Sequence, residues 1–200
     1  GTPLGEAKQR LATAMGERVA MALSNLRLHE TLRNQSIRDP LTGLFNRSFM
    51  EEALELELRR AARTQGTLVV IMAALDRFQK MTEDWGLDAG DSLLCRTAAL
   101  LQSRIRKGDV ACRFSGHAFV LLLPQSGRDV GRRRAETLRD LVRGMDVQYP
   151  GAREGDRVSA SVGMALFPDH GQTVEALLRS AEAAVGRARS GGGDSVVVAS

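Results

Sequence analysis

The sequence predicts an α+β domain in which helices cover a mixed sheet. Apolar runs of strand length alternate along the chain with longer amphipathic segments. Two of those runs, 109–114 and 118–124, are separated by Ser115-Gly116-His117, a hairpin signal. The length of 200 residues suits one domain with an extension. The predicted order of elements is α-α-β-α-β-β-α-β-α-β.

The first predicted helix covers 6–35, where apolar residues recur every three or four positions. They are Leu11, Met15, Val19, Ala22 and Leu26. Two interpretations of this narrow stripe stay open: a parallel coiled coil in a homodimer, or packing on its own or an upstream domain. The chain starts without Met, so we expect a fragment whose upstream sensor domain is missing. The expected division is a linker helix over 1–35 and a domain over 36–200.

A break separates this helix from the next one. Pro40 disfavours the helical conformation at Asp39, and Gly43 permits a tight turn. A second helix is predicted over 48–63. Ser48 and Glu51 have the spacing of a capping box, and Asn46 is a rival N-cap.

The remaining elements follow from apolar periodicity and from breakers. Strands are predicted over 67–74, 109–114, 118–124, 158–167 and 194–198. Helices are predicted over 91–106, 129–143 and 173–190. The segment 76–88 is polar and shows no clear period, so no element is predicted there.

Composition narrows the classes of function. Apolar residues make up 43% and charged residues 26%, which excludes wholesale disorder. No apolar run is long enough to span a bilayer, and the start does not resemble a signal peptide. The low number of cysteines, Cys95 and Cys112, fits a reducing setting, so a cytoplasmic protein is expected. With two cysteines, a disulfide framework or Cys-rich metal site is excluded. The net charge is +4, but the arginines are scattered among acids, so no nucleic-acid partner is predicted.

Two motifs carry a family resemblance. Residues 39–47 read D-P-L-T-G-L-F-N-R, which is similar to the D-x-L-T-G-L-x-N-R opening of the GGDEF family, the diguanylate cyclases. Residues 113–119 read R-F-S-G-H-A-F, where that family has R-[YF]-G-G-[DE]-E-F. The resemblance covers roughly 36–199. It implies a nucleotidyl-cyclase palm with a β-α-β-β-α-β core, helices on both faces and the signature hairpin at the site. The first helix resembles the linker between a GAF sensor and such a domain.

The resemblance also implies a chemistry, and this chain departs from its pattern. Family members join two GTP molecules into cyclic di-GMP with divalent cations held by carboxylates. The signature keeps Gly116, but the two metal-binding acids are Ala74 and His117, and the next glutamate is Ala118. Asp76 lies on the same side as Ala74 but roughly 7 Å further along the strand. We therefore expect no metal cofactor and no catalytic residues.

The positions that the resemblance assigns to GTP are altered as well. The guanine-reading asparagine is Thr82, whereas the second guanine contact, Asp91, is kept. Of the two C-terminal phosphate contacts, Arg189 keeps the charge of a lysine, and Gly193 replaces an arginine. GTP binding stays open at this point.

One element of the family pattern looks intact. Arg106 and Asp109 form an R-x-x-D in the register of the family's inhibitory product site. An arginine fork can bind a guanine edge and a phosphate, and Asp109 can accept from guanine N–H groups. The family's second arginine is Thr137 here, and Arg133 and Arg134 lie one turn earlier. Arg106 and Asp109 have an alternative interpretation as a helix-terminal arginine followed by an aspartate in a turn. Arg133 and Arg134 have an alternative interpretation as part of a solvated basic helix face.

Three functions are thus open. The first is an inactive GGDEF domain that acts as a receptor for cyclic di-GMP, a bacterial second messenger. The second is a structural transducer that dimerises through its first helix and binds no ligand. The third is a weak diguanylate cyclase, which alone would need Mg²⁺. The number of site carboxylates separates the third from the others, and a titration with cyclic di-GMP separates the first two.

Overall fold

The computed structural model describes residues 15, 18, 21, 37–146 and 157–200. The chain divides into two compact units, Gly1–Ile37 and Arg38–Ser200. The helix predicted over 6–35 lies outside the described residues except for Met15, Arg18 and Met21, which are helical. The predicted self-association through that helix is therefore not tested by the structure.

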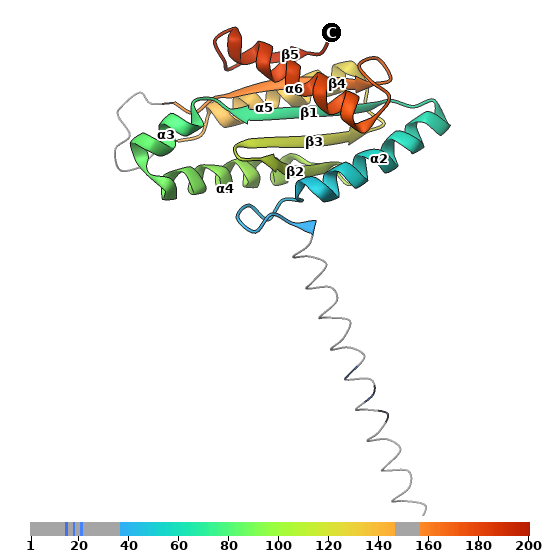
Figure 1. The fold of residues 1–200 in the computed structure, drawn as a ribbon, viewed down its shortest axis with the longest axis horizontal. Helices are drawn as coiled ribbons and strands as arrows, with labels where there is room; N and C mark the ends of the chain where they lie inside the picture. Colours follow the sequence, from blue (N-terminus) through green and yellow to red (C-terminus); the bar gives the residue numbers. More distant parts are fainter. Residues whose placement is uncertain (1–14, 16–17, 19–20, 22–36, 147–156) are drawn as a thin grey trace, which may run out of the picture. The chain divides into compact units, whose positions relative to one another are not determined.

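The second unit is built on a five-stranded sheet in the order β2-β3-β1-β4-β5 (Figure 1). The strands are β1 (Leu68–Leu75), β2 (Val110–Ser115), β3 (Ala118–Pro124), β4 (Ala160–Phe167) and β5 (Val196–Val198). Neighbouring strands are antiparallel except β4 and β5, which are parallel. The predicted mixed sheet is confirmed.

Helices cover both faces of the sheet, as predicted. One core cluster joins α3 (Phe78–Trp85), α4 (Leu87–Arg104) and α5 (Arg128–Arg143) to the sheet. The other joins α2 (Arg47–Thr64) and α6 (Val174–Ser190) to its opposite face. Every residue of the central strand β1 is buried, because alternate side chains enter the two clusters. Among the described residues, no helix is both long and apolar enough to cross a membrane.

One local prediction was wrong, and one open alternative is decided in favour of Asn46. The polar segment 76–88 contains the whole of α3 and the start of α4. Helix α3 has only eight residues, and its apolar face consists of Phe78, Met81 and Trp85, of which only Met81 is fully buried. Three apolar residues over two turns are too few to stand out as a helical period in a polar segment. At the start of α2 the N-cap is Asn46, whose side chain accepts from the Phe49 amide at 3.0 Å. Ser48 is therefore inside the helix and forms no capping box.

A close approach of backbone to backbone places α6 against the sheet. Gly163 lies in β4, and a Cβ at this position would meet the carbonyl oxygen of Ala181 in α6. Only glycine allows this packing without a shift. Arg189, near the end of α6, is thereby held at the end of β1, where its guanidinium lies 3.5 Å from the Leu75 carbonyl oxygen.

Candidate functional site

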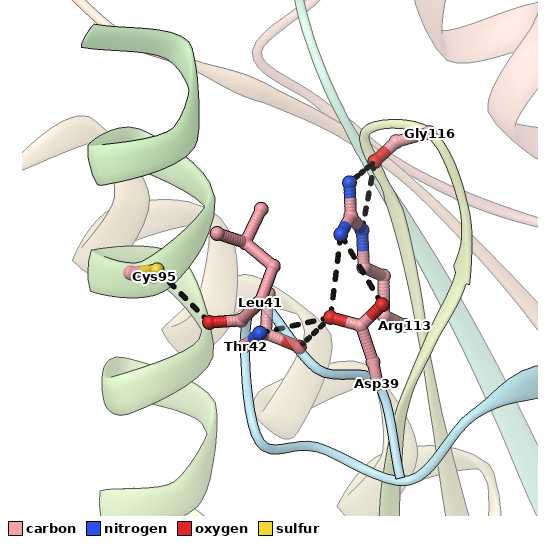
Figure 2. A network of polar contacts seen from close by, with 6 residues as sticks. All are labelled: Asp39, Leu41, Thr42, Cys95, Arg113 and Gly116. Atoms are coloured by element: carbon pink, nitrogen blue, oxygen red, sulfur yellow. Dashed lines mark hydrogen bonds and ion pairs between the residues drawn. The ribbon is translucent and has the colours of Figure 1, made fainter. Parts of the chain in front are cut away.

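The turn at Asp39 and the hairpin between β2 and β3 are joined by one ion pair (Figure 2). The Asp39 carboxylate accepts from the Thr42 amide at 2.8 Å and from its hydroxyl at 2.6 Å. Arg113 in β2 donates to both Asp39 oxygens at 3.2 Å. The same guanidinium donates to the Gly116 carbonyl at 3.1 and 3.0 Å. One arginine thus holds the shape of the hairpin and fastens it to the turn.

The charge of Asp39 is stabilised by these donors. Partial burial raises the pKa of its carboxyl, but the Thr42 hydrogen bonds and the Arg113 guanidinium outweigh burial, and the pKa lies below its ordinary value. The turn has further anchors: Phe45 exchanges backbone hydrogen bonds with Ala111 and Arg113 in β2. The Cys95 thiol of α4 donates to the Leu41 carbonyl at 3.2 Å (Figure 2).

At the end of β1, methyl groups occupy two positions where the resemblance led us to expect carboxylates. Ala74 is buried and pairs directly with Ala118 across the β1–β3 ladder. The Leu75 amide, one residue on, donates to the His117 carbonyl oxygen at 3.2 Å. The hairpin therefore closes onto the strand end as the family pattern implies, but neither alanine offers a side-chain oxygen ligand.

The third of these positions, His117, is paired with a cation. Its ring stacks on Phe78 with centroids 5.4 Å apart, and its Nε2 lies 2.7 Å from a guanidinium nitrogen of Arg189. Because a guanidinium only donates, Nε2 is the acceptor and the ring proton sits on Nδ1. Burial, and then the positive charge of Arg189, lower the pKa of His117, while Asp76 raises it. The lone pair that a metal would need is already occupied.

The carboxylate of Asp76 is occupied by hydrogen bonds that connect parts of the fold. Its carboxylate accepts from the hydroxyls of Ser159 at 2.6 Å and Ser161 at 2.7 Å, and from the Asp194 amide at 3.0 Å. Gly193 has a φ of 79°, and a Cβ there would lie 2.9 Å from an Asp76 oxygen. This close approach gives a physical reason for glycine at that position. Asp76 therefore ties β1 to the start of β4 and to the loop after α6.

The donor set does not fit the divalent cations of the family. In the described part of the chain, no three His, Cys, Asp or Glu side chains gather closely enough to hold a metal ion. Thr82, the expected counterpart of the guanine-reading residue, donates its hydroxyl to the Phe78 carbonyl within α3 at 2.8 Å. Asp91 is exposed in α4.

The R-x-x-D sequence forms a closed turn directly after α4. The Asp109 amide donates to the Arg106 carbonyl at 3.0 Å, and the Arg106 amide donates to Oδ2 of Asp109 at 2.8 Å. Arg134 of α5 donates to the same Oδ2 at 2.8 Å, and the two side chains are only 19% and 11% exposed. Arg106 is exposed, and its guanidinium makes no hydrogen bond or ion pair among the residues described.

The structure brings only one of the two expected helper arginines to this turn. Arg134 pairs with Asp109, whereas the exposed Arg133 side chain forms no hydrogen bond or ion pair with a described residue. The Thr137 hydroxyl donates to the Arg133 carbonyl oxygen at 2.8 Å, so it forms a hydrogen bond within α5 and not with the R-x-x-D turn. The Arg134–Asp109 pair joins α5 to the turn in a way that a gapless match to the family did not indicate.

A profile described as diguanylate cyclase, GGDEF domain, matches residues 36–195 of this chain. The chain belongs to the GGDEF family. It is 35% identical over 170 residues to the diguanylate cyclase DgcP of Pseudomonas aeruginosa, which covers 85% of this chain. It is 31% identical over 190 residues to the response regulator PleD of Caulobacter vibrioides, which covers 92% of this chain. The matched regions span 25% of DgcP and 42% of PleD, so the GGDEF chain corresponds to less than half of either relative.

Solved structures agree with the GGDEF fold. The diguanylate cyclase SiaD of Pseudomonas aeruginosa, solved with its activator SiaC, superposes with a TM-score of 0.77 at 33% identity, covering 98% of this chain and 74% of SiaD. The coiled coil and GGDEF domain of DgcB from Caulobacter crescentus, solved with cyclic di-GMP, superposes with a TM-score of 0.80 at 23% identity, covering 97% and 98% of the two chains. The palm predicted from the resemblance is therefore confirmed.

Proposed function

We propose that this GGDEF domain is a cytoplasmic receptor for cyclic di-GMP and does not synthesise it. The observation that carries the proposal is the geometry of the R-x-x-D turn. Oδ2 of Asp109 is held by Arg134 and by the Arg106 amide, while the Arg106 guanidinium stays free in the described part of the chain. A fixed carboxylate next to a free arginine is a recognition pair for a guanine nucleotide.

Three side chains at this turn have distinct roles in the proposed binding of the nucleotide. The remaining oxygen of Asp109, Oδ1, accepts no hydrogen bond from the described residues and can accept from the N–H edge of a guanine. The fork of Arg106 matches the O6 and N7 edge of a guanine or two oxygens of a phosphate. The hydrogen bonds from Arg134 and from the Arg106 amide hold the Asp109 side chain in one orientation, so little side-chain entropy is lost on binding.

The identity of the proposed ligand, cyclic di-GMP, is based on the activity of relatives in the family. Relatives such as DgcP are diguanylate cyclases, whose product carries two guanines and two phosphates. A domain that keeps a product-binding turn but lacks the synthetic site acts as a receptor for the product of other family members.

The absence of synthesis rests on the end of β1. Phosphoryl transfer in this family needs cations that neutralise the α-phosphates, and cations need oxygen ligands. Here Ala74 and Ala118 supply methyl groups, and His117 is paired with the positively charged Arg189. A guanidinium at that position also repels a divalent cation. These residues do not fit Mg²⁺, and no reaction step is assigned to them.

The proposal extends to assembly. The apolar stripe over 6–35 supports a homodimer through the linker helix, and we propose that this linker receives its signal from a sensor domain. A receptor organised in this way would bind cyclic di-GMP in its GGDEF domain and receive a second signal through the linker.

Two measurements on the 200-residue chain test the proposal. Calorimetric titration with cyclic di-GMP should show binding that persists when EDTA removes divalent cations. Incubation with GTP and Mg²⁺ or Mn²⁺, followed by chromatography, should show no cyclic di-GMP above a blank. Turnover at a rate typical of a cyclase would refute the inactive assignment. The absence of binding heat would refute the receptor and leave the structural transducer.

A further inference from the structure

A groove of about 920 Å³ lies between α2 and α6, on the sheet face away from α5 and the Arg134 contact. Its floor is apolar and is formed by residues of both helices and of the strands beneath them. These residues are Leu58, Ala62, Phe114, Phe167, Val174 and Leu178. The groove takes no part in the proposed binding of cyclic di-GMP.

The walls of this groove are acidic, in contrast to the rest of the molecule. Five glutamates and three arginines line it, whereas the whole chain carries a net charge of +4. Two of the arginines are neutralised within α2, by the Arg47–Glu51 pair at 2.7 Å and the Arg59–Glu55 pair at 3.0 Å. The third, Arg179, lies one turn from Glu175, whose pKa is lowered first by hydrogen bonds from its own backbone and from Thr173 and then by the charge of Arg179.

Two carboxylates are left without a partner, one on each wall. Glu52 of α2 and Glu182 of α6 are exposed, and neither forms a hydrogen bond or ion pair with any described residue. An apolar floor between two unneutralised acidic walls is complementary to a surface that is apolar along one stripe and basic on both sides of it.

We propose that this groove docks an amphipathic helix of a partner protein, with its apolar stripe on the groove floor and basic side chains against Glu52 and Glu182. Two helical walls around an apolar floor favour the helix-in-groove mode of recognition. A nucleic acid or an anionic membrane surface does not fit, because the same carboxylates repel phosphates. The most arginine-rich described helix of a second copy does not fit either, because the apolar residues of α5 are buried in its own core.

The groove also reaches the strand that carries the hairpin. Phe114 belongs to β2 and follows Arg113, and the guanidinium of Arg47 lies 4.5 Å from the centre of its ring. The same strand begins at Val110, directly after Asp109. A helix in the groove would therefore contact β2, the strand that runs from the R-x-x-D turn to the hairpin. Binding of a ligand at the turn and binding of a partner in the groove would thus involve the same strand.

Fluorescence anisotropy with two synthetic helical peptides tests the docking. Both carry the same leucine stripe with i, i+3, i+4 and i+7 spacing; one is flanked by lysine and arginine, the other by glutamate. With the full chain, the basic peptide should bind at least about tenfold more tightly than the acidic one, and added salt should weaken it. Glu52→Arg and Glu182→Arg should each weaken it by about fivefold or more. Glu83→Arg, the same charge change on an exposed residue of α3 on the other sheet face, should leave it within about twofold.

Three results would overturn the proposal. The first is equal affinity for the basic and acidic peptides. The second is an equal loss in Glu83→Arg and in the two groove variants, which would show an effect of net charge alone. The third is a chain that dimerises through the groove, seen as a sedimentation dimer that Glu52→Arg and Glu182→Arg dissociate and Glu83→Arg does not. Melting curves of each variant show whether the fold is intact.

Discussion

The ion pair between Asp39 and Arg113 should be a main support of the hairpin. The two residues are 74 positions apart, and their side chains are 17% and 19% exposed. Arg113→Ala removes the donors to both Asp39 oxygens and to the Gly116 carbonyl, and Asp39→Ala leaves the guanidinium and the Thr42 amide without their acceptor. Hydrogen bonds to charged groups contribute about 1.5–3 kcal/mol, and breaking a fully buried pair costs about 3–5 kcal/mol.

The pair is only partly buried, so we expect a loss at the lower end of the buried range, about 3 kcal/mol of unfolding free energy for each single alanine variant. In a unit of this size that corresponds to a fall in Tm of about 6–12 °C. The double variant should lose less than the sum of the two, with a coupling energy of about 1.5–3 kcal/mol.

Urea denaturation of the four proteins measures the coupling directly. The matched control is the exposed pair Arg59–Glu55, with side chains 67% and 58% exposed, where the same cycle should give less than about 1 kcal/mol. Since the pKa of Asp39 is lowered on folding, its contribution is present above the pKa of the unfolded carboxyl, 3.8, and is lost as the pH falls through the lower folded value. A coupling energy for Asp39–Arg113 no larger than that of the control pair would refute the reasoning.

Three further predictions concern other parts of the domain. The pKa of His117 is lowered on folding, so stability should fall as the pH drops below about 6.5, and His117→Gln should flatten that part of the urea-derived stability curve; an unchanged slope would contradict the half-buried, Arg189-paired ring. Asp76→Ala leaves three donors without their acceptor and should cost about 2–4 kcal/mol of unfolding free energy, whereas a loss under about 1 kcal/mol would argue against its structural role. Sedimentation at tens of micromolar, on the order of common weak dimers, should show a dimer that Val19→Glu with Leu26→Glu dissociates; a monomeric parent chain would remove the coiled-coil interpretation.

Sequence patterns predicted the sheet because its strands are buried on both sides or bounded by clear breakers. β3 occupies the predicted span 118–124, and β1 differs from its predicted span by one residue at each end. Helix α3 was missed because it is short and its apolar face has only three residues, Phe78, Met81 and Trp85. The start of the helix also depends on Arg77 adopting a φ of 50°, which sequence does not reveal.

The site was predictable as a set of positions but not as a set of contacts. The motifs indicated that Asp39, Arg113, Arg106 and Asp109 matter, since each stands in a recognisable pattern. They did not indicate that Asp39 pairs with Arg113 or Asp109 with Arg134, because such pairs form between elements far apart in the chain. For the same reason, the sequence did not indicate the contacts of His117, which replaces an acidic residue of the family and lies beside Arg189 and Phe78.

The central claim is that Arg106 and Asp109 bind cyclic di-GMP, and titration calorimetry of the parent chain and Arg106→Ala tests it most directly. The account predicts binding by the parent and a loss of about 1.5–3 kcal/mol in the variant, which is about tenfold to 150-fold in Kd. Arg143→Ala, which removes the arginine of an R-x-x-D outside the family register, should leave Kd within about twofold. No binding heat from the parent chain, or equal losses in Arg106→Ala and Arg143→Ala, would contradict the account.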